Sequence, residues 1–129
     1  MSHSSGRFFS LLFLALLLAG LLRTAGAQAQ RYSIVDLGLF PGGTISYANG
    51  INASGQVTGY ASLSSGPYRA FRTPAAGKIS ADTDLGTFPG GAYSAGSGIN
   101  ASGQVTGVTG VDDVTAHAFR TTAGGQDQR

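Results

Sequence analysis

The sequence contains no cysteine and no glutamate, and only 11% of its 129 residues are charged. Without cysteine, the chain cannot form the disulfides on which small exported domains often depend. It also has no thiol nucleophile and no cysteine-based metal site. Because glutamate is absent, all six acidic side chains are aspartates. The chain has eight Lys and Arg residues, and its formal net charge is +2.

The N-terminus has the pattern of an export signal. A short polar segment precedes an apolar run at 8–22, and small residues around Ala27 and Ala29 follow it. This order is typical of a secretory signal peptide, so we expect residues 1–27 to be one, with cleavage after Ala27 or Ala29. A membrane anchor would need about 20 apolar residues, and Arg23 ends the run too early. We therefore expect a secreted chain, extracellular or periplasmic, with no stable membrane span after cleavage.

Removal of this segment also changes the charge. Arg7 and Arg23 leave with it, so the exported part has 8 − 2 = 6 basic and 6 acidic residues. A balanced chain without a basic stripe is not expected to bind nucleic acid. About 100 residues remain, which is enough for at most one small domain.

An internal repeat dominates the exported part. Residues 36–77 recur at 84–125 without a gap, and 24 of these 42 positions are identical. The ten residues 50–59 return unchanged at 98–107. A period of 48 residues is typical of solenoids, propellers and repeat arrays. The predicted organisation is a β-repeat region at 28–129, with repeat one at 32–79 and repeat two at 80–125.

Short strands between turn signals are expected within each repeat, and no stretch has helical spacing. In repeat one, β-branched and aromatic residues predict strands at 32–37, 47–51, 56–60 and 68–73. Asn52–Gly55 has the composition of a turn. Because Phe71 recurs as Phe119, both rings are predicted to be core anchors.

These features predict an all-β fold of two tandem 48-residue repeats, each resembling a propeller blade. A β-solenoid and two hairpins in a sandwich are the alternatives. A closed propeller has about four to eight blades, so two repeats predict a partial β-propeller. Its open strand edges would allow self-association.

Three recurring segments together resemble a known family. They are Asp-Leu-Gly followed by Gly-Gly, the segment Gly-Ile-Asn-x-Ser-Gly-Gln-Val-x-Gly, and the triplet His117-Ala118-Phe119. They are similar to the HAF repeats, a family of bacterial exported proteins named after the His-Ala-Phe triplet. The resemblance covers residues 32–125, although repeat one has Arg69 at the place of the histidine. It implies an exported, propeller-like β-repeat protein, and the family has no general catalytic assignment to transfer to these residues.

Few residues suggest chemistry. His117 is the one histidine left after signal removal, whereas a metal site needs several converging ligands and a catalytic triad needs a nucleophile and an orienting group. We expect His117 to have a structural place on a strand. Asp112 and Asp113 are adjacent but lack the pattern of a calcium loop, which favours a solvated hairpin tip. We therefore predict no catalytic residue, no metal ligand and no cofactor.

The two copies differ most at one place. Residues 60–69 and 108–117 share no identity, although the segments on both sides of them are unchanged. Repeat proteins often bind ligands through variable loops on a fixed scaffold. Tyr68, Asp112 and Asp113 are therefore candidate ligand-facing residues, and simple drift of exposed hairpin tips is the alternative.

The leading hypothesis is an exported, non-enzymatic interaction or structural module that binds a protein or a carbohydrate. One alternative is a fragment of a secreted propeller-type hydrolase or lyase. The other is a carbohydrate-binding surface module, which would use exposed aromatic rings such as Tyr60, Tyr68 and Tyr93.

Overall fold

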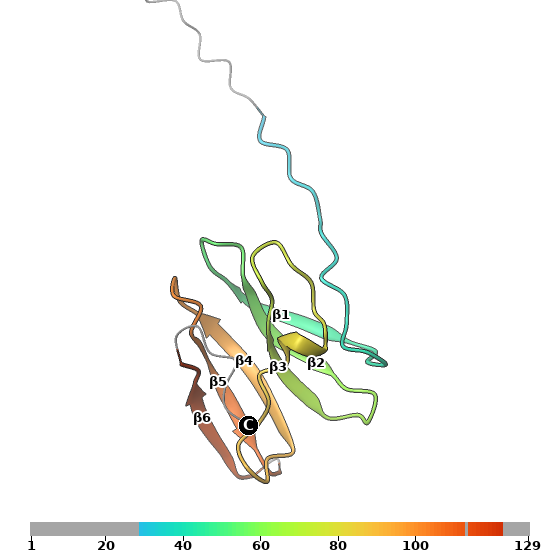
Figure 1. Cartoon of the computed structure of the whole chain (residues 1–129), viewed down its shortest axis with the longest axis vertical. Coiled ribbons are helices and arrows are strands. Elements are labelled where there is room, and N and C mark those ends of the chain that lie inside the picture. The colour runs from blue at the N-terminus through green and yellow to red at the C-terminus, as the bar shows by residue number, and fades with distance from the viewer. Residues whose placement is uncertain (1–28, 113, 123–129) are drawn as a thin grey trace, which may run out of the picture. The chain divides into compact units, whose positions relative to one another are not determined.

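The computed structural model describes residues 29–112 and 114–122 (Figure 1). The chain divides into two units, Met1–Ile34 and Val35–Arg129. Residues 29–34 of the first unit hold no helix or strand. The predicted signal peptide at 1–27 lies outside the described residues. Within those residues, no helix is long and apolar enough to cross a membrane.

Six strands form two separate three-stranded antiparallel sheets, in the orders β1-β2-β3 and β4-β5-β6 (Figure 1). The strands are β1 (Ser46–Ile51), β2 (Val57–Ser62), β3 (Tyr68–Arg72), β4 (Tyr93–Ile99), β5 (Val105–Gly110) and β6 (Ala116–Arg120). The one helix in the described part is a single 3-10 turn, η1 (Ala81–Thr83). The all-β prediction is confirmed. The described residues form no closed barrel or propeller.

The two sheets use corresponding residues of the two copies. Strands β5 and β6 have the bounds of β2 and β3 moved by 48 residues. The pair Ser46↔Ala61 in the first sheet corresponds to Ser94↔Thr109 in the second. Pairing in the second sheet begins one pair earlier, at Tyr93↔Gly110, and then follows the same register as in the first.

A β-bulge interrupts the first strand of each sheet. The register shifts between Ala48 and Gly50 in β1 and between Gly96 and Gly98 in β4. The extra residues are Asn49 and Ser97, and such an insertion changes which side chains share a face. Because of the bulge, Tyr47 lies opposite Tyr60.

The strand predicted at 32–37 is wrong. Tyr32, Ile34 and Val35 are largely exposed, and no strand is formed there. The Asp36 carboxylate accepts a bond from the Gly38 N–H at 2.9 Å, which makes a local turn instead of continuing an extended ladder. Residues with strand propensity stay irregular here because, in the part of the chain that the structure describes, they have no pairing strand.

The hydrophobic core lies on one face of the first sheet. It consists of Phe40, Val57, Ala61, Phe71 and Ile79, with Leu37 and Leu63 packed against it. Phe71 is fully buried, as predicted. Phe119 is only half-buried, so its prediction as an equivalent anchor is wrong. Phe88, the counterpart of buried Phe40, is 45% exposed, which leaves the second sheet with a more open core.

Strand β4 joins the two sheets. The Ser94 hydroxyl accepts a bond from the Ala70 N–H at 2.9 Å, and the Asn49 amide donates to Gly96 O at 2.7 Å. The Arg72 guanidinium donates to Gly103 O at 2.7 Å. A Cβ atom built on Gly96 would collide with the Thr58 hydroxyl. Glycine at this position therefore permits the close approach with Thr58 placed as it is.

Candidate functional site

The segments that differ between the copies form two corresponding hairpins. Residues 60–69 run from the second half of β2 to the start of β3, and residues 108–117 run in the same way from β5 to β6. Both hairpins project from sheets whose strand pairing is the same. The described structure thus places the sequence differences on matching loops and strand ends.

Three tyrosines gather on the first sheet, and we call them the tyrosine cluster: Tyr47, Tyr60 and Tyr68. The rings of Tyr47 and Tyr60 stack, with centroids 5.1 Å apart and an interplanar angle of 28°. Tyr68 meets Tyr60 edge to face, at 5.4 Å and 82°. Tyr47 and Tyr68 are 52% and 40% exposed. Aromatic rings that are packed against one another and still exposed are a ready-made contact surface.

The cluster follows from the strand register. Tyr47 and Tyr60 are direct cross-strand partners, and Tyr68 is paired with Ser62, two residues further along β2. Direct and diagonal cross-strand neighbours on one face are close enough for aromatic rings to touch. The corresponding places of the second sheet hold Ala95, Val108 and Ala116, so the cluster belongs to repeat one.

Of the tyrosines considered from the sequence, Tyr60 and Tyr68 are brought together, and Tyr93 is not. Tyr93 lies on β4, where its hydroxyl is close to Gly110. Tyr47 was missed because its position opposite Tyr60 depends on the bulge at Asn49. The pairing of β1 with β2 across the Asn52–Gly55 turn is the signal that would have found it.

Asp112 shapes the second hairpin. Its carboxylate accepts bonds from the N–H groups of Thr115 at 2.6 Å and Val114 at 3.0 Å. These bonds, that from Thr115 above all, lower the pKa of Asp112, because they stabilise its charged form. The Asp112 Oδ1 atom thus accepts both bonds from within the turn. Asp113 lies outside the described residues, and the described residues contain no group of three or more His, Cys, Asp or Glu side chains able to hold a metal ion.

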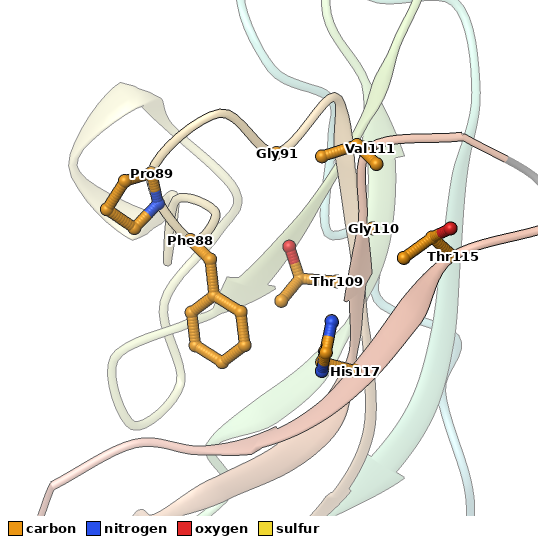
Figure 2. Close-up of a pocket in the computed structure, with 8 residues that line it drawn as sticks. All are labelled: Phe88, Pro89, Gly91, Thr109, Gly110, Val111, Thr115 and His117. Atoms are coloured by element: carbon orange, nitrogen blue, oxygen red, sulfur yellow. The ribbon is translucent and has the colours of Figure 1, made fainter.

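A pocket of about 270 Å³ lies beside the second hairpin (Figure 2). Its lining combines apolar side chains with two threonines and a histidine: Phe88, Pro89, Gly91, Thr109, Gly110, Val111, Thr115 and His117. In Figure 2 the Phe88 ring, the Thr109 side chain and the His117 imidazole surround one space. The corresponding space of repeat one is occupied by its core, since Phe40 is buried and Leu63 packs against it.

The polar groups of this pocket have limited capacity for chemistry. The Thr109 hydroxyl donates to Tyr93 O at 2.9 Å. His117 lies on β6, as predicted, but it is exposed, with its ring 6.3 Å from that of Phe88. The pocket therefore offers mainly an apolar wall with one imidazole at its edge. A mostly apolar lining with a few polar groups is typical of a pocket that holds a small ligand or a side chain.

Comparison of the chain with protein-family models, with curated proteins and with solved structures gives no match.

Proposed function

We propose that this chain is an exported, non-enzymatic binding module of the HAF-repeat type, built from two propeller-like blades. The blade proposal is supported by the corresponding sheets and by the segment after η1. There, Asp84 forms a β-bridge with Phe71, and the Leu85 N–H donates to Ala70 O at 2.9 Å. This segment lies beside β3 where a fourth strand of a blade would run.

The tyrosine cluster carries the binding proposal. Tyr47 and Tyr68 are exposed and both pack against the half-buried Tyr60, and the second sheet has no tyrosine at the corresponding places. A large exposed aromatic group on a small domain is a mark of an interaction site. It also lies in part on the hairpin that differs between the copies.

Carbohydrate is the ligand class that this surface favours. The C–H bonds on one face of a sugar ring carry partial positive charge and pack against the negative face of an aromatic ring. Tyrosine hydroxyls at the edge of the stack add donors and acceptors for sugar hydroxyls. The balanced charge of the exported part is also consistent with a neutral ligand.

A titration against defined sugars tests this proposal. Purified chain is titrated by calorimetry with hexasaccharides of cellulose, chitin, xylan and mannan. At least one should bind, and Tyr47→Ala and Tyr68→Ala should each weaken that binding at least about tenfold, as loss of an aromatic anchor does. Tyr32→Ala is the matched control, because Tyr32 is 85% exposed and is not part of the cluster.

Circular dichroism establishes that each variant keeps its strands. Failure of all four sugars to bind would remove carbohydrate as the ligand class. Equal weakening by the Tyr32 control would show that the cluster is not the site.

A further inference from the structure

The contact between the two sheets has a directional pattern. The outer backbone edge of β3 meets the second repeat: the Ala70 N–H bonds the Ser94 hydroxyl at 2.9 Å, and Ala70 O accepts from the Leu85 N–H at 2.9 Å. Ala70, whose N–H and carbonyl both make these bonds, is fully buried. One repeat therefore contributes a strand edge, and the next contributes an Asp-Leu-Gly segment and a serine.

The second sheet presents the same strand edge without such a cover. Ala118 corresponds to the fully buried Ala70 and is exposed. Within the described residues, no segment lies beside Ala118 as Leu85 lies beside Ala70. The face around Ala118 is small and apolar, with Ala95, Val108 and Ala116 on it. We call this surface the tail face.

The first repeat presents the complementary segment, already shaped. Gly38 N–H bonds the Asp36 carboxylate at 2.9 Å, as Gly86 N–H bonds Asp84 at 2.7 Å. The Ser46 hydroxyl donates to Gly38 O at 3.0 Å, as the Ser94 hydroxyl donates to Gly86 O at 2.6 Å. We call residues 36–48 the head segment. It needs little ordering to bind, which lowers the entropic cost of association.

We propose that the tail face of one chain binds the head segment of a second copy, in the geometry that joins the two repeats within the chain. Ala118 N–H would bond the Ser46 hydroxyl of the second copy, and Ala118 O would accept from its Leu37 N–H. Arg120 would donate to Gly55 O of that copy, as Arg72 donates to Gly103 O. This proposal does not depend on what the tyrosine cluster binds.

One position differs between the two junctions. The second copy would present Ala48 where the internal junction has Gly96, and a Cβ atom there would collide with a threonine hydroxyl placed as in Thr58. Thr58 donates its hydroxyl to Phe71 O at 2.7 Å. The Thr106 hydroxyl lies instead near Gly98, 3.4 Å from a Cβ built there. This position of the Thr106 hydroxyl relieves the collision seen with Thr58. The carbonyl of Gly107, the counterpart of the Gly59 carbonyl that lies 3.1 Å from a Cβ built on Gly96, would remain a close neighbour of the Ala48 methyl group.

A contact of this kind is head-to-tail, so it produces either a closed ring or an open filament. Because a propeller closes with about four to eight blades and each chain supplies two, a ring would contain about two to four copies. The expected product is a discrete oligomer of this size.

Paired blocking variants test the proposal. Ala118→Arg places a long side chain on the tail face, and Ala48→Arg does the same on the head segment. Both alanines are exposed in the single chain, so both variants should fold, which circular dichroism verifies. By analytical ultracentrifugation, the unmodified chain should form the oligomer and each variant alone should be monomeric. An equimolar mixture of the two should form a 1:1 dimer and nothing larger.

Two further variants complete the design. Ser65→Arg adds the same side chain at the exposed tip of the β2–β3 hairpin and should assemble like the unmodified chain. Ala48→Gly restores the residue of the internal junction and should raise the assembled fraction at a given concentration. Tyr68 lies in the tyrosine cluster but outside the head segment and the tail face, so Tyr68→Ala should leave assembly unchanged, which separates this test from that of sugar binding.

A monomeric unmodified chain up to millimolar concentration would overturn the proposal. So would an oligomer that Ala118→Arg leaves intact, because it would be held by another surface. Failure of the two blocked variants to form a dimer with each other would exclude the head-to-tail arrangement.

Discussion

Replacement of Phe71 with alanine is expected to cause the largest loss of stability among the aromatic residues of this chain. The ring is fully buried, and it packs in the core with Phe40, Val57 and Ile79. A buried aromatic side chain removes roughly 150–250 Å² from water. At about 25 cal/mol per Å² of apolar surface, this contributes roughly 4–6 kcal/mol. Because alanine keeps part of that area, we expect Phe71→Ala to lower the free energy of unfolding by about 3–5 kcal/mol.

Phe119→Ala is the matched control. Phe119 is paired with Gly107 as Phe71 is paired with Gly59, but it is only half-buried. Phe119→Ala should therefore lower the free energy of unfolding clearly less than Phe71→Ala does. Urea denaturation followed by far-ultraviolet circular dichroism, at low protein concentration, gives both values from the shift of the midpoint at constant slope.

The stabilities of the two phenylalanine variants can contradict the described cores in two ways. If Phe119→Ala lowers stability as much as Phe71→Ala, the two repeats have equivalent cores and the described difference in burial does not govern stability. If neither variant changes the midpoint, the cluster around Phe71 is not the core of the fold.

Three further outcomes are expected. Folding lowers the pKa of Asp112, so the ionised carboxylate stabilises the fold above pH 3.8, the ordinary pKa of aspartate, and this stabilisation is lost as the pH falls through the lowered pKa. Melting temperatures measured over a pH series should therefore fall less steeply at acid pH in Asp112→Asn than in the unmodified chain. Gly59→Ala should lower stability by roughly 1–3 kcal/mol in urea denaturation, because its Cβ would collide with the carbonyl of the neighbouring strand, and an unchanged midpoint would contradict the strand pairing. The exported chain should begin at Gln28 or Gln30 by intact-mass measurement, whereas a membrane-bound chain starting at Met1 would contradict cleavage.

Local turn chemistry made much of the fold predictable from the sequence. Asn and Gly at 52–55 close the β1–β2 hairpin through short-range bonds: the Asn52 side chain accepts from the N–H groups of Ser54 and Gln56. Information of this kind lies within a few neighbouring residues. The five-residue run at 68–72 likewise forms a strand, because its alternating side chains match a half-buried sheet.

Features that depend on distant partners were not predictable in the same way. Residues 32–37 have strand propensity but no partner, and propensity alone does not form a ladder. Phe71 and Phe119 each lie in the sequence Ala-Phe-Arg-Thr, and this shared sequence does not distinguish the buried ring from the half-buried one. The tyrosine cluster depends on a one-residue shift in strand register at Asn49. An asparagine at this position does not by itself predict a bulge.

The bulge at Asn49 has a consequence for how such a repeat can change over time. The residue inserted there takes no part in the regular pairing of its own sheet, yet its side chain reaches the neighbouring sheet at Gly96 O. A substitution at this position can therefore alter how two repeats adhere while leaving each repeat able to fold. Repeat two already has Ser97 there. The residue at the bulge thus affects the contact between repeats and not the strand pairing within a repeat. Copies can therefore change at this position in how they contact each other without losing the ability to fold.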